Sequence, residues 1–460
     1  MPTDQAEVVI CGAGIAGLAT AYHLTVGCGL KQVVVVDPRP PMSLTSDKST
    51  ECYRNWWPGP GDGMVRLMNR SIDLLEQLAD ESGNRFNLNR RGYVYATANP
   101  DRVQGFLDQA QEAAELGSGA MRLHKGRPGD PPYIPAPAEG YHNLPDGADV
   151  FLAPNLIQKH FPYLPAETVA VIHARRCGYF SAQQLGVYLL EQIRMHGGRL
   201  IEGEVNGVEQ DNDRIAAVEV ATAGGMRTIR TRHFVNAAGP MLKDVGRMVG
   251  IELPVFSELH IKVSFSDPLG AFPRNTGLLI WTDPQKLPWS PEERRVLQED
   301  ELGKSMLQEF PEGVHGRPEG PQDSPVFLLL WTYHTDPVKP IFPIPTDPLY
   351  PEIALRGMST MIPALKGYFD RIPRPYVDGG YYTKTQENRP LAGPLPMPGA
   401  WVVGALSGFG LMAALACGEL VALGITGQSI PEYARWFTLD RYQNPEYQAL
   451  LKDWGRTGQL

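Results

Sequence analysis

The chain has 460 residues, a net charge of −9 and 43% hydrophobic residues. This length indicates two or three domains with a large apolar core and excludes a wholly disordered chain. No Lys/Arg block is present, which argues against a nucleic-acid partner, and no apolar run is long enough to predict a membrane span. The five cysteines contain no CxxC pair, so we expect neither a metal site nor a disulfide framework. With only a short polar segment before residue 8, we expect a cytoplasmic protein.

The first 37 residues predict a strand–helix–strand unit that binds a dinucleotide. An apolar strand over residues 8–11 leads into the turn GAGIAG at 12–17, a helix to Leu24 and a second strand ending in Asp37. Glycines in such a turn permit a tight reversal and close approach of a pyrophosphate to the helix N-terminus. The Asp37 carboxylate suits ribose hydroxyls and disfavours a 2′-phosphate, so the unit favours FAD or NAD over NADP.

The rest of the chain predicts alternating helices and strands. Helical spacing marks residues 64–82, 100–116 and 182–196, and strands are expected near 91–97, 199–205, 215–222, 234–238, 327–331 and 401–405. Residues 284–325 are polar and Pro-rich, and we interpret them as an insertion. A second glycine turn at 408–410 precedes a helix to residue 425, whose N-terminus suits negative charge on a reduced flavin ring.

Four stretches carry a resemblance to a known family. They are residues 8–37; Ser49-Thr50 with Arg54 and the 64–82 helix; 178–180 with 204–205 and 236–239; and 387–390 with Gly404 and 407–410. Together they resemble the FAD-dependent D-amino-acid oxidase superfamily, which contains sarcosine oxidase, glycine oxidase and dimethylglycine dehydrogenase.

The resemblance implies an α/β fold, α+β overall, in which a Rossmann-like FAD-binding domain is interleaved with a mainly antiparallel substrate domain. The expected FAD-binding segments are 1–90, 155–257 and 375–445. The expected substrate-domain segments are 91–154 and 258–374, followed by a C-terminal tail at 446–460. The flavin is expected to be bound non-covalently, because Gly380 stands where sarcosine oxidases carry the linking cysteine. A covalent bond from Cys52 is the alternative.

Position in the family also assigns the residues expected to contact FAD. They are Gly12, Gly14, Ile15, Ala16, Gly17, Asp37, Arg39, Lys48, Ser49, Thr50, Val205, Ala238, Gly239, Arg389, Gly404, Gly408, Phe409, Gly410 and Leu411.

Four residues are candidates for the substrate side. Arg54 can pair with a substrate carboxylate, whereas the alternative is a structural arginine. The His334 position resembles a pocket histidine of sarcosine oxidase, and Tyr382 and Lys384 lie on the strand before the Asn-Arg-Pro segment. Trp56 and Trp57 are candidates for an aromatic wall together with Phe409 and Tyr382, or else for core packing. The lysine that the family uses toward oxygen aligns with Leu330.

The implied activity is oxidation of the C–N bond of an amine or amino acid. A hydride passes to flavin N5, the resulting imine hydrolyses, and oxygen or another acceptor takes the electrons. Dehydrogenation of a 2-hydroxy acid or another alcohol is the first alternative. A flavin-bearing assembly protein without turnover and a plain NAD-dependent dehydrogenase are the others.

Overall fold

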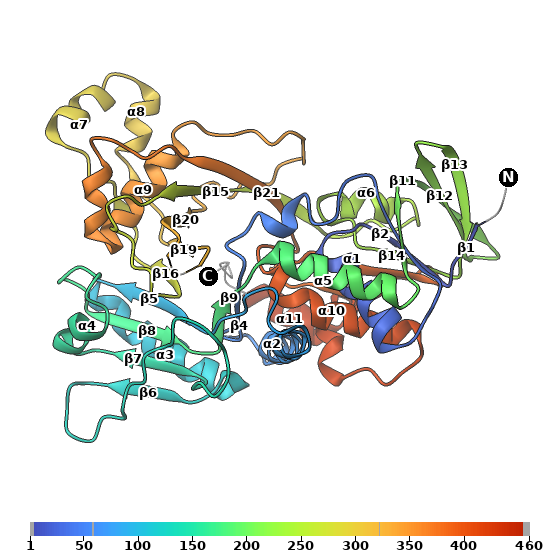
Figure 1. Cartoon of the computed structure of the whole chain (residues 1–460), viewed down its shortest axis with the longest axis horizontal. Helices are drawn as coiled ribbons and strands as arrows, with labels where there is room; N and C mark the ends of the chain where they lie inside the picture. The colour runs from blue at the N-terminus through green and yellow to red at the C-terminus, as the bar shows by residue number, and fades with distance from the viewer. Residues whose placement is uncertain (1–3, 58, 322, 454–460) are drawn as a thin grey trace.

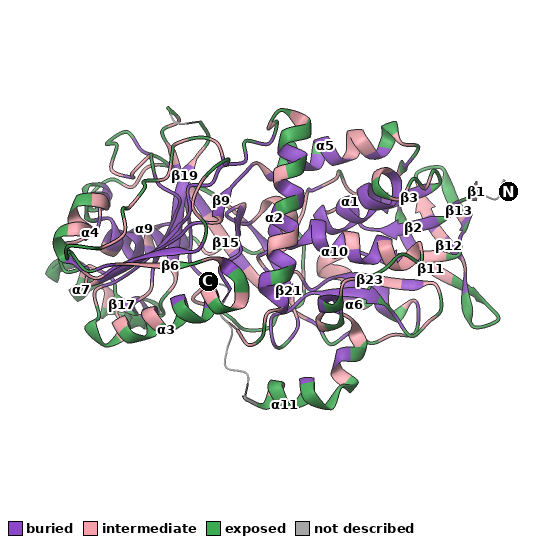
Figure 2. Cartoon of the chain, turned by 90° about the horizontal axis from the view of Figure 1, so that it is seen from below, coloured by how far each residue is buried: buried purple, intermediate pink, exposed green. Residues whose placement is uncertain are grey.

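The computed structural model describes residues 4–57, 59–321 and 323–453, and it arranges them in two regions that lie side by side (Figure 1). One region is built on a six-stranded sheet and the other on a nine-stranded sheet. Buried residues fill both sheets and the helices between them, whereas α11 (Pro445–Asp453) is largely exposed (Figure 2). The predicted tail therefore begins in a helix, and residues 454–460 lie outside the described residues.

The six-stranded sheet has the order β10-β3-β2-β14-β23-β22. Its pairs are parallel from β10 to β23, and β22 runs antiparallel to β23. Every residue of β2 is buried, as expected for a parallel strand covered on both faces. The strands are β2 (Val8–Cys11), β3 (Val33–Asp37), β10 (Arg199–Glu202), β14 (His233–Asn236), β22 (Leu391–Pro394) and β23 (Ala400–Gly404).

Helices cover one face of this sheet and a smaller sheet covers the other. Ile10 packs among the residues of α1 (Ile15–Tyr22), α2 (Gly63–Ser82), α5 (Ala182–Met195) and α10 (Gly410–Ile425). Val9 packs in the opposite cluster with the smaller sheet and α6 (Leu242–Arg247). The smaller sheet has the order β1-β13-β12-β11, with β1 (Asp4–Gln5), β11 (Glu204–Asp211), β12 (Arg214–Thr222) and β13 (Gly225–Arg230).

The nine-stranded sheet has the order β21-β15-β20-β19-β16-β5-β8-β7-β6 and is mainly antiparallel. Its apolar face packs on α9 (Tyr350–Met361) and α4 (Pro154–His160). The opposite face packs against α3 (Val103–Ala113) and the short pair β4 (Cys52–Arg54) and β9 (Cys177–Tyr179). The strands are β5 (Tyr93–Thr97), β6 (Met121–His124), β7 (Ala148–Phe151), β8 (Ala170–Ala174), β15 (Phe256–Ser266), β16 (Leu278–Trp281), β19 (Val314–Glu319), β20 (Val326–Leu330) and β21 (Tyr376–Lys384).

The predicted fold class is confirmed, because a Rossmann-like parallel sheet is interleaved with a mainly antiparallel one. The segment interpreted as an insertion, 284–325, needs correction. Only its first part protrudes, as β17 (Gln285–Lys286), α7 (Pro291–Leu297), α8 (Glu301–Met306) and β18 (Glu309–Phe310) (Figure 1). Its second part contains β19, which pairs on both sides inside the nine-stranded sheet. The expected start of the second FAD-binding segment, residue 155, is also too early. Strand β8 still lies in the nine-stranded sheet, so the chain returns to the six-stranded region only after residue 174.

Within the described ranges, no helix combines the length and the apolar character needed to cross a bilayer.

Candidate active site

The first glycine turn joins β2 to α1 and leaves no room for side chains. Gly12 has φ +111°, and a Cβ there would lie 2.4 Å from the Ala237 carbonyl oxygen. A Cβ on Gly17 would lie 1.9 Å from the Gly12 oxygen. Both positions therefore require glycine, the first for its backbone and the second for the close packing of helix on turn.

The Asp37 carboxylate ties the end of β3 to this turn. Its Oδ2 accepts a hydrogen bond from the Ala13 N–H at 2.8 Å, and its Oδ1 accepts one from the Arg39 N–H at 2.9 Å. The acid thus lies beside the glycine turn at the carboxyl end of a parallel strand, where ligands bind in sheets of this type.

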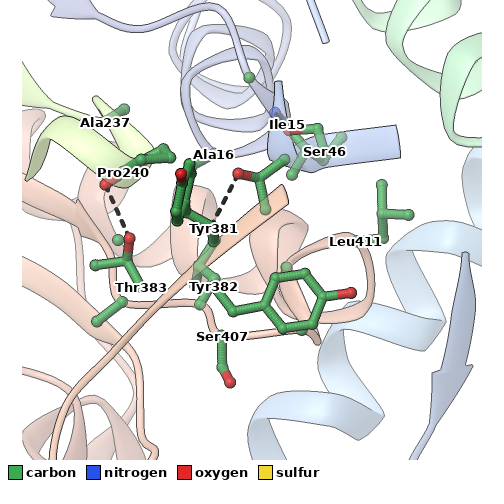
Figure 3. A pocket seen from close by; sticks show the side chains of 18 of the residues that line it. Ile15, Ala16, Ser46, Ala237, Pro240, Tyr381, Tyr382, Thr383, Ser407 and Leu411 are labelled. Carbon is green, nitrogen blue, oxygen red and sulfur yellow. Dashed lines mark hydrogen bonds between the residues drawn. The ribbon is translucent and has the colours of Figure 1, made fainter. Parts of the chain in front are cut away.

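A cavity that opens to solvent lies where the glycine turn, α10 and β21 meet, with about 580 Å³ of empty space including its open mouth (Figure 3). Both α1 and α10 begin at this cavity. Neither N-cap residue makes a side-chain capping bond, and at the start of α1 the Ile15 N–H donates to Ser46 Oγ at 2.9 Å. Two helix N-termini therefore border the space, which favours an anionic ligand. The lining residues are Gly14, Ile15, Ala16, Thr45, Ser46, Ser49, Ala237, Gly239, Pro240, Tyr381, Tyr382, Thr383, Val403, Gly404, Ala405, Leu406, Ser407, Gly408, Gly410 and Leu411.

Ser407 marks this cavity as a ligand site. Its Oγ is buried and finds no hydrogen-bond partner among the described residues, and its backbone has φ +50°. Unpaired buried hydroxyls and left-handed non-glycine residues are costly, and both concentrate at functional sites. An unsatisfied hydroxyl, small residues and two helix N-termini together fit a dinucleotide cofactor such as FAD.

The predicted cofactor residues divide into three groups. Nine line the cavity: Gly14, Ile15, Ala16, Ser49, Gly239, Gly404, Gly408, Gly410 and Leu411. Four shape the turn at its edge: Gly12, Gly17, Asp37 and Arg39. The other six do not line it: Lys48, Thr50, Val205, Ala238, Arg389 and Phe409. Ten other lining residues were not among those expected to contact FAD or substrate, although most are neighbours of residues that were: Thr45, Ser46, Ala237, Pro240, Tyr381, Thr383, Val403, Ala405, Leu406 and Ser407.

Residues of the third group make other contacts within the protein. Lys48 forms ion pairs with Asp378 at 2.8 Å and Asp47 at 3.1 Å. Arg389 donates to the Pro60 carbonyl oxygen, and Val205 pairs with Val220 between β11 and β12. Phe409, the residue before α10, packs edge-to-face on Trp57 with 5.1 Å between ring centroids.

The pairing of the nine-stranded sheet collects polar side chains on the face turned toward this cavity. Residues paired across neighbouring strands share one face of a sheet. Lys262 pairs with Leu330, Leu330 with His315, His315 with Ile280, and Ile280 with Tyr95. The two ends of this row show that this face of the sheet is turned toward the cavity and Arg54. At one end Lys262 Nζ donates to the carbonyl oxygen of Ser49, a cavity residue, at 3.2 Å, and at the other end Tyr95 Oη accepts a hydrogen bond from Arg54.

Arg54 is buried at the end of β4 and lies among aromatic rings. Its Nη1 donates to Tyr95 Oη at 2.7 Å, and its guanidinium lies 4.6 Å from the centroid of the Trp57 ring. Trp57 in turn contacts Phe409, whose neighbours Gly408 and Gly410 line the cavity. A chain of contacts therefore connects the Arg54 charge to the cofactor side of the molecule. Trp57 and Phe409 are both part of the buried core and neither lines the cavity, which agrees with core packing, the alternative to an aromatic wall.

Tyr382 lies between the cavity and a buried polar chain. Its ring stacks on His260, with centroids 4.0 Å apart. His260 Nε2 donates to Glu258 Oε2 at 3.0 Å, and Lys384 Nζ donates to the same oxygen at 2.6 Å. The Thr332 hydroxyl and His260 Nδ1 are 2.8 Å apart. Burial lowers the pKa of His260 to about 4, so the ring is neutral and holds both bonds as one donor and one acceptor.

The structure separates the four candidates for the substrate side. Arg54 and Tyr382 lie at the junction of the two sheets, and Lys384 is held in its ion pair with Glu258. His334 lies on an exposed loop after β20 and contacts the Tyr333 ring. His260 and His315 do face the junction, and the sequence offered no sign of this because their placement depends on strand pairing.

A parallel sheet with a glycine turn, a second helix N-terminus at the same cavity and a facing antiparallel sheet are typical of a flavin-dependent oxidoreductase. The chain belongs to the FAD dependent oxidoreductase (DAO) family, which matches residues 7–423. FAD is therefore its cofactor, and it is an enzyme of this class.

Curated relatives match part of the chain. Human mitochondrial dimethylglycine dehydrogenase is 26% identical over 260 residues, which cover 56% of this chain and 26% of that protein. Sarcosine oxidase subunit beta of Rhizobium meliloti is 27% identical over 266 residues, covering 57% of this chain and 56% of that one. The match thus spans about a quarter of the first relative and about half of the second.

Solved structures share the fold over nearly the whole chain. L-Proline dehydrogenase from P. horikoshii has a TM-score of 0.72 and 18% identity, with 96% of this chain and 98% of that one covered. Glycine oxidase from Geobacillus kaustophilus has a TM-score of 0.71 and 16% identity, with 95% and 99% covered. These likenesses establish the fold.

Proposed function

We propose that this enzyme oxidises the C–N bond of an amine that also carries a carboxylate. Bound FAD supplies the chemistry, as the acceptor of the hydride removed from the carbon next to nitrogen. The chain's own residues bind and orient the substrate, and the resulting imine hydrolyses to a carbonyl compound and an amine. The relatives named for dimethylglycine, sarcosine, glycine and proline support this substrate class.

The buried Arg54 guanidinium carries the proposal. A permanent cation among aromatic rings beside the cofactor cavity suits a planar carboxylate, which can accept two parallel hydrogen bonds from it. The rings of Trp57 and Tyr93, whose centroids lie 4.6 and 6.0 Å from the guanidinium, exclude water and strengthen such a pair. Anchoring the carboxylate fixes the neighbouring C–H bond relative to the cofactor, and positioning of this kind is a large part of catalysis.

FAD itself would be held along the cavity by the chain's backbone and small side chains. The α1 N-terminus, with Gly14 and Ile15, suits the diphosphate, and the Asp37 carboxylate suits the ribose. The α10 N-terminus and the Ser407 hydroxyl suit the polar edge of the flavin ring. The bond is proposed to be non-covalent. Cys52 supports this, because its Sγ contacts the Thr50 carbonyl oxygen and burial raises the pKa of the thiol to about 11.

Anaerobic titration of the purified yellow protein tests the reaction. We expect amino acids or N-alkyl amino acids to bleach the flavin band, and the matching amines without a carboxylate to do so weakly. Bleaching by 2-hydroxy acids alone would support the alcohol alternative. A flavin that no substrate reduces, although dithionite does, would support an assembly protein instead. Acid precipitation of the same sample reports whether the flavin is covalently attached.

Replacement of Arg54 tests the carboxylate contact. Arg54→Gln should lower kcat/KM for the best amino acid by about 10²-fold or more, as expected when one partner of a desolvated charge pair is lost. The amine without a carboxylate should react nearly as before. Arg85→Gln is the matched control, because Arg85 pairs with Glu191 on the exposed surface. An equal loss on both substrates would indicate a structural role for Arg54.

The electron acceptor is proposed to be oxygen or a second electron carrier, and Lys262 bears on this choice. By the family resemblance the lysine falls near Leu330, and Leu330 pairs with Lys262. The Lys262 ammonium donates to the Asp47 and Ser49 carbonyl oxygens at 2.7 and 3.2 Å. If oxygen is the acceptor, Lys262→Met should slow reoxidation of the reduced enzyme in stopped-flow experiments. We further propose a cytoplasmic location, supported by five free cysteines and testable by cell fractionation.

A further inference from the structure

A second polar group on the Arg54 side of the nine-stranded sheet is the ring of His315 on β19. His315 Nδ1 lies 2.8 Å from the Gly313 carbonyl oxygen. Because a carbonyl only accepts, Nδ1 carries the hydrogen and Nε2 of the neutral ring presents a lone pair. No described residue donates to this Nε2. His23 Nε2 is fully buried and has no hydrogen-bond partner, whereas His315 Nε2 is not fully buried in this way.

The surroundings keep this ring neutral. Burial lowers the pKa of His315 to about 4, and the neighbouring His260 and Arg54 add to the shift. Both neighbours lie on the same side of the molecule: His315 belongs to the row that ends in Tyr95, whose hydroxyl holds Arg54. The site therefore offers a fixed cation and, beside it, a hydrogen-bond acceptor that the protein leaves unused.

We infer that His315 Nε2 accepts a hydrogen bond from the N–H group of the substrate, while Arg54 holds the carboxylate. This assignment rests on the proposed function and deepens it, because it names the substrate class as primary or secondary amino acids. A second carboxylate would be repelled by the lone pair, and the Arg54 charge disfavours an ammonium beside it. The amine thus binds in its neutral form, the form that can lose a hydride, and a neutral tertiary amine has no N–H to donate.

Ligand binding without turnover tests the inference. The ligands are the best amino acid found by flavin bleaching, or glycine if none bleaches it, together with its N,N-dimethyl derivative and the carboxylic acid that lacks nitrogen. Calorimetric titration of the dithionite-reduced holoenzyme under anaerobic conditions gives each Kd, because a reduced flavin cannot oxidise the ligand. In the wild-type protein the amino acid should bind about tenfold or more tightly than the other two, as expected for one buried hydrogen bond.

Three variants separate the outcomes. His315→Phe should abolish the preference for the amino acid and leave binding of the plain acid within about twofold, whereas His315→Gln, whose amide oxygen still accepts, should keep part of it. His160→Phe on α4 is the matched control and should change neither. A preference unaffected by His315→Phe overturns the inference while the proposed function stands. If no carboxylate ligand binds and no amine bleaches the flavin, both fail. FAD stoichiometry of each variant shows that it is folded.

Discussion

The two sides of this site are built from different materials. On the cofactor side, backbone and small residues make the surface, as at Gly12 and Gly17, where the next atoms leave no room for a Cβ. On the proposed substrate side, large polar side chains make the surface, and they come from strands that only sheet pairing brings together, as with Arg54, His260 and His315. A site made of backbone tolerates few changes of sequence, whereas one made of side chains can be altered one residue at a time.

The largest expected effect comes from a substitution on the cofactor side, in the glycine turn. Gly17→Val places side-chain atoms where even a Cβ would lie 1.9 Å from the Gly12 oxygen, so α1 cannot pack on the turn. We expect loss of bound FAD and of most soluble protein, measured as the flavin-to-protein ratio and the yield.

A glycine outside the site is the control. Gly105 in α3 has no heavy atom within 4 Å of the place where a Cβ would be. Gly105→Ala should therefore raise the free energy of unfolding by about 0.5–1 kcal/mol. A Gly17→Val protein that retains stoichiometric FAD would contradict the account of the turn.

This difference also explains what the sequence could predict. The glycine turn, Asp37 and the α10 start lie within short segments, so their spacing is visible in the sequence, and nine of the residues that the family resemblance assigns to FAD line the cavity. The polar chain Glu258–His260–Thr332 could not be predicted, since alternation along one strand does not reveal which face meets the cofactor region. β19 was interpreted as part of an insertion because its sequence, with Gly316 and Pro318, lacks the apolar pattern of a central strand. His334 is the opposite case. Its local sequence resembles a pocket segment of the family, but the side chain lies on an exposed loop.

The next largest effect concerns the polar chain behind Tyr382. His260→Phe keeps a ring against Tyr382 but removes the donor to Glu258 and the partner of the Thr332 hydroxyl. We expect a loss of about 1–3 kcal/mol in the free energy of unfolding and a higher KM, with unchanged FAD content. Denaturant unfolding and steady-state kinetics measure these. The control Thr332→Val removes one hydroxyl only and should cost less. A loss of FAD in His260→Phe would show that the two sides are not separable.

The Ser407 hydroxyl should have opposite effects with and without FAD. It should lower the stability of the apoprotein and raise the affinity for FAD. Ser407→Ala removes a buried hydroxyl that lacks a partner, so the apoprotein should gain about 1 kcal/mol. The holoprotein should lose affinity for FAD by about tenfold, which is about 1.4 kcal/mol. Thermal unfolding of apoprotein and FAD titration provide the two numbers. Ser407→Gly should stabilise the apoprotein further, because it also relieves the φ of +50°. Equal shifts in both states would refute the cofactor contact.

The smallest effect concerns Glu51, which lies between the two sides next to Thr50. Burial raises the pKa of its carboxyl from 4.5 to about 7, although Arg317 Nη2 lies 3.4 Å away. The stability that the protonated acid contributes is therefore complete below pH 4.5 and is lost as the pH rises through about 7. Glu51→Gln removes this loss, while Arg317 keeps Glu319 at 2.8 Å.

The difference in thermal midpoint between Glu51→Gln and the wild type should thus increase by about 1–2 °C from pH 5 to pH 8. The shift is small because the chain is long. Glu191→Gln is the opposite case, because the hydrogen bond from exposed Arg85 lowers the pKa of Glu191. The stability from that pair is lost as the pH falls, so its variant should show no gain at pH 8. If the Glu51→Gln difference is flat or falls between the two pH values, the carboxyl is ionised throughout and burial does not control it.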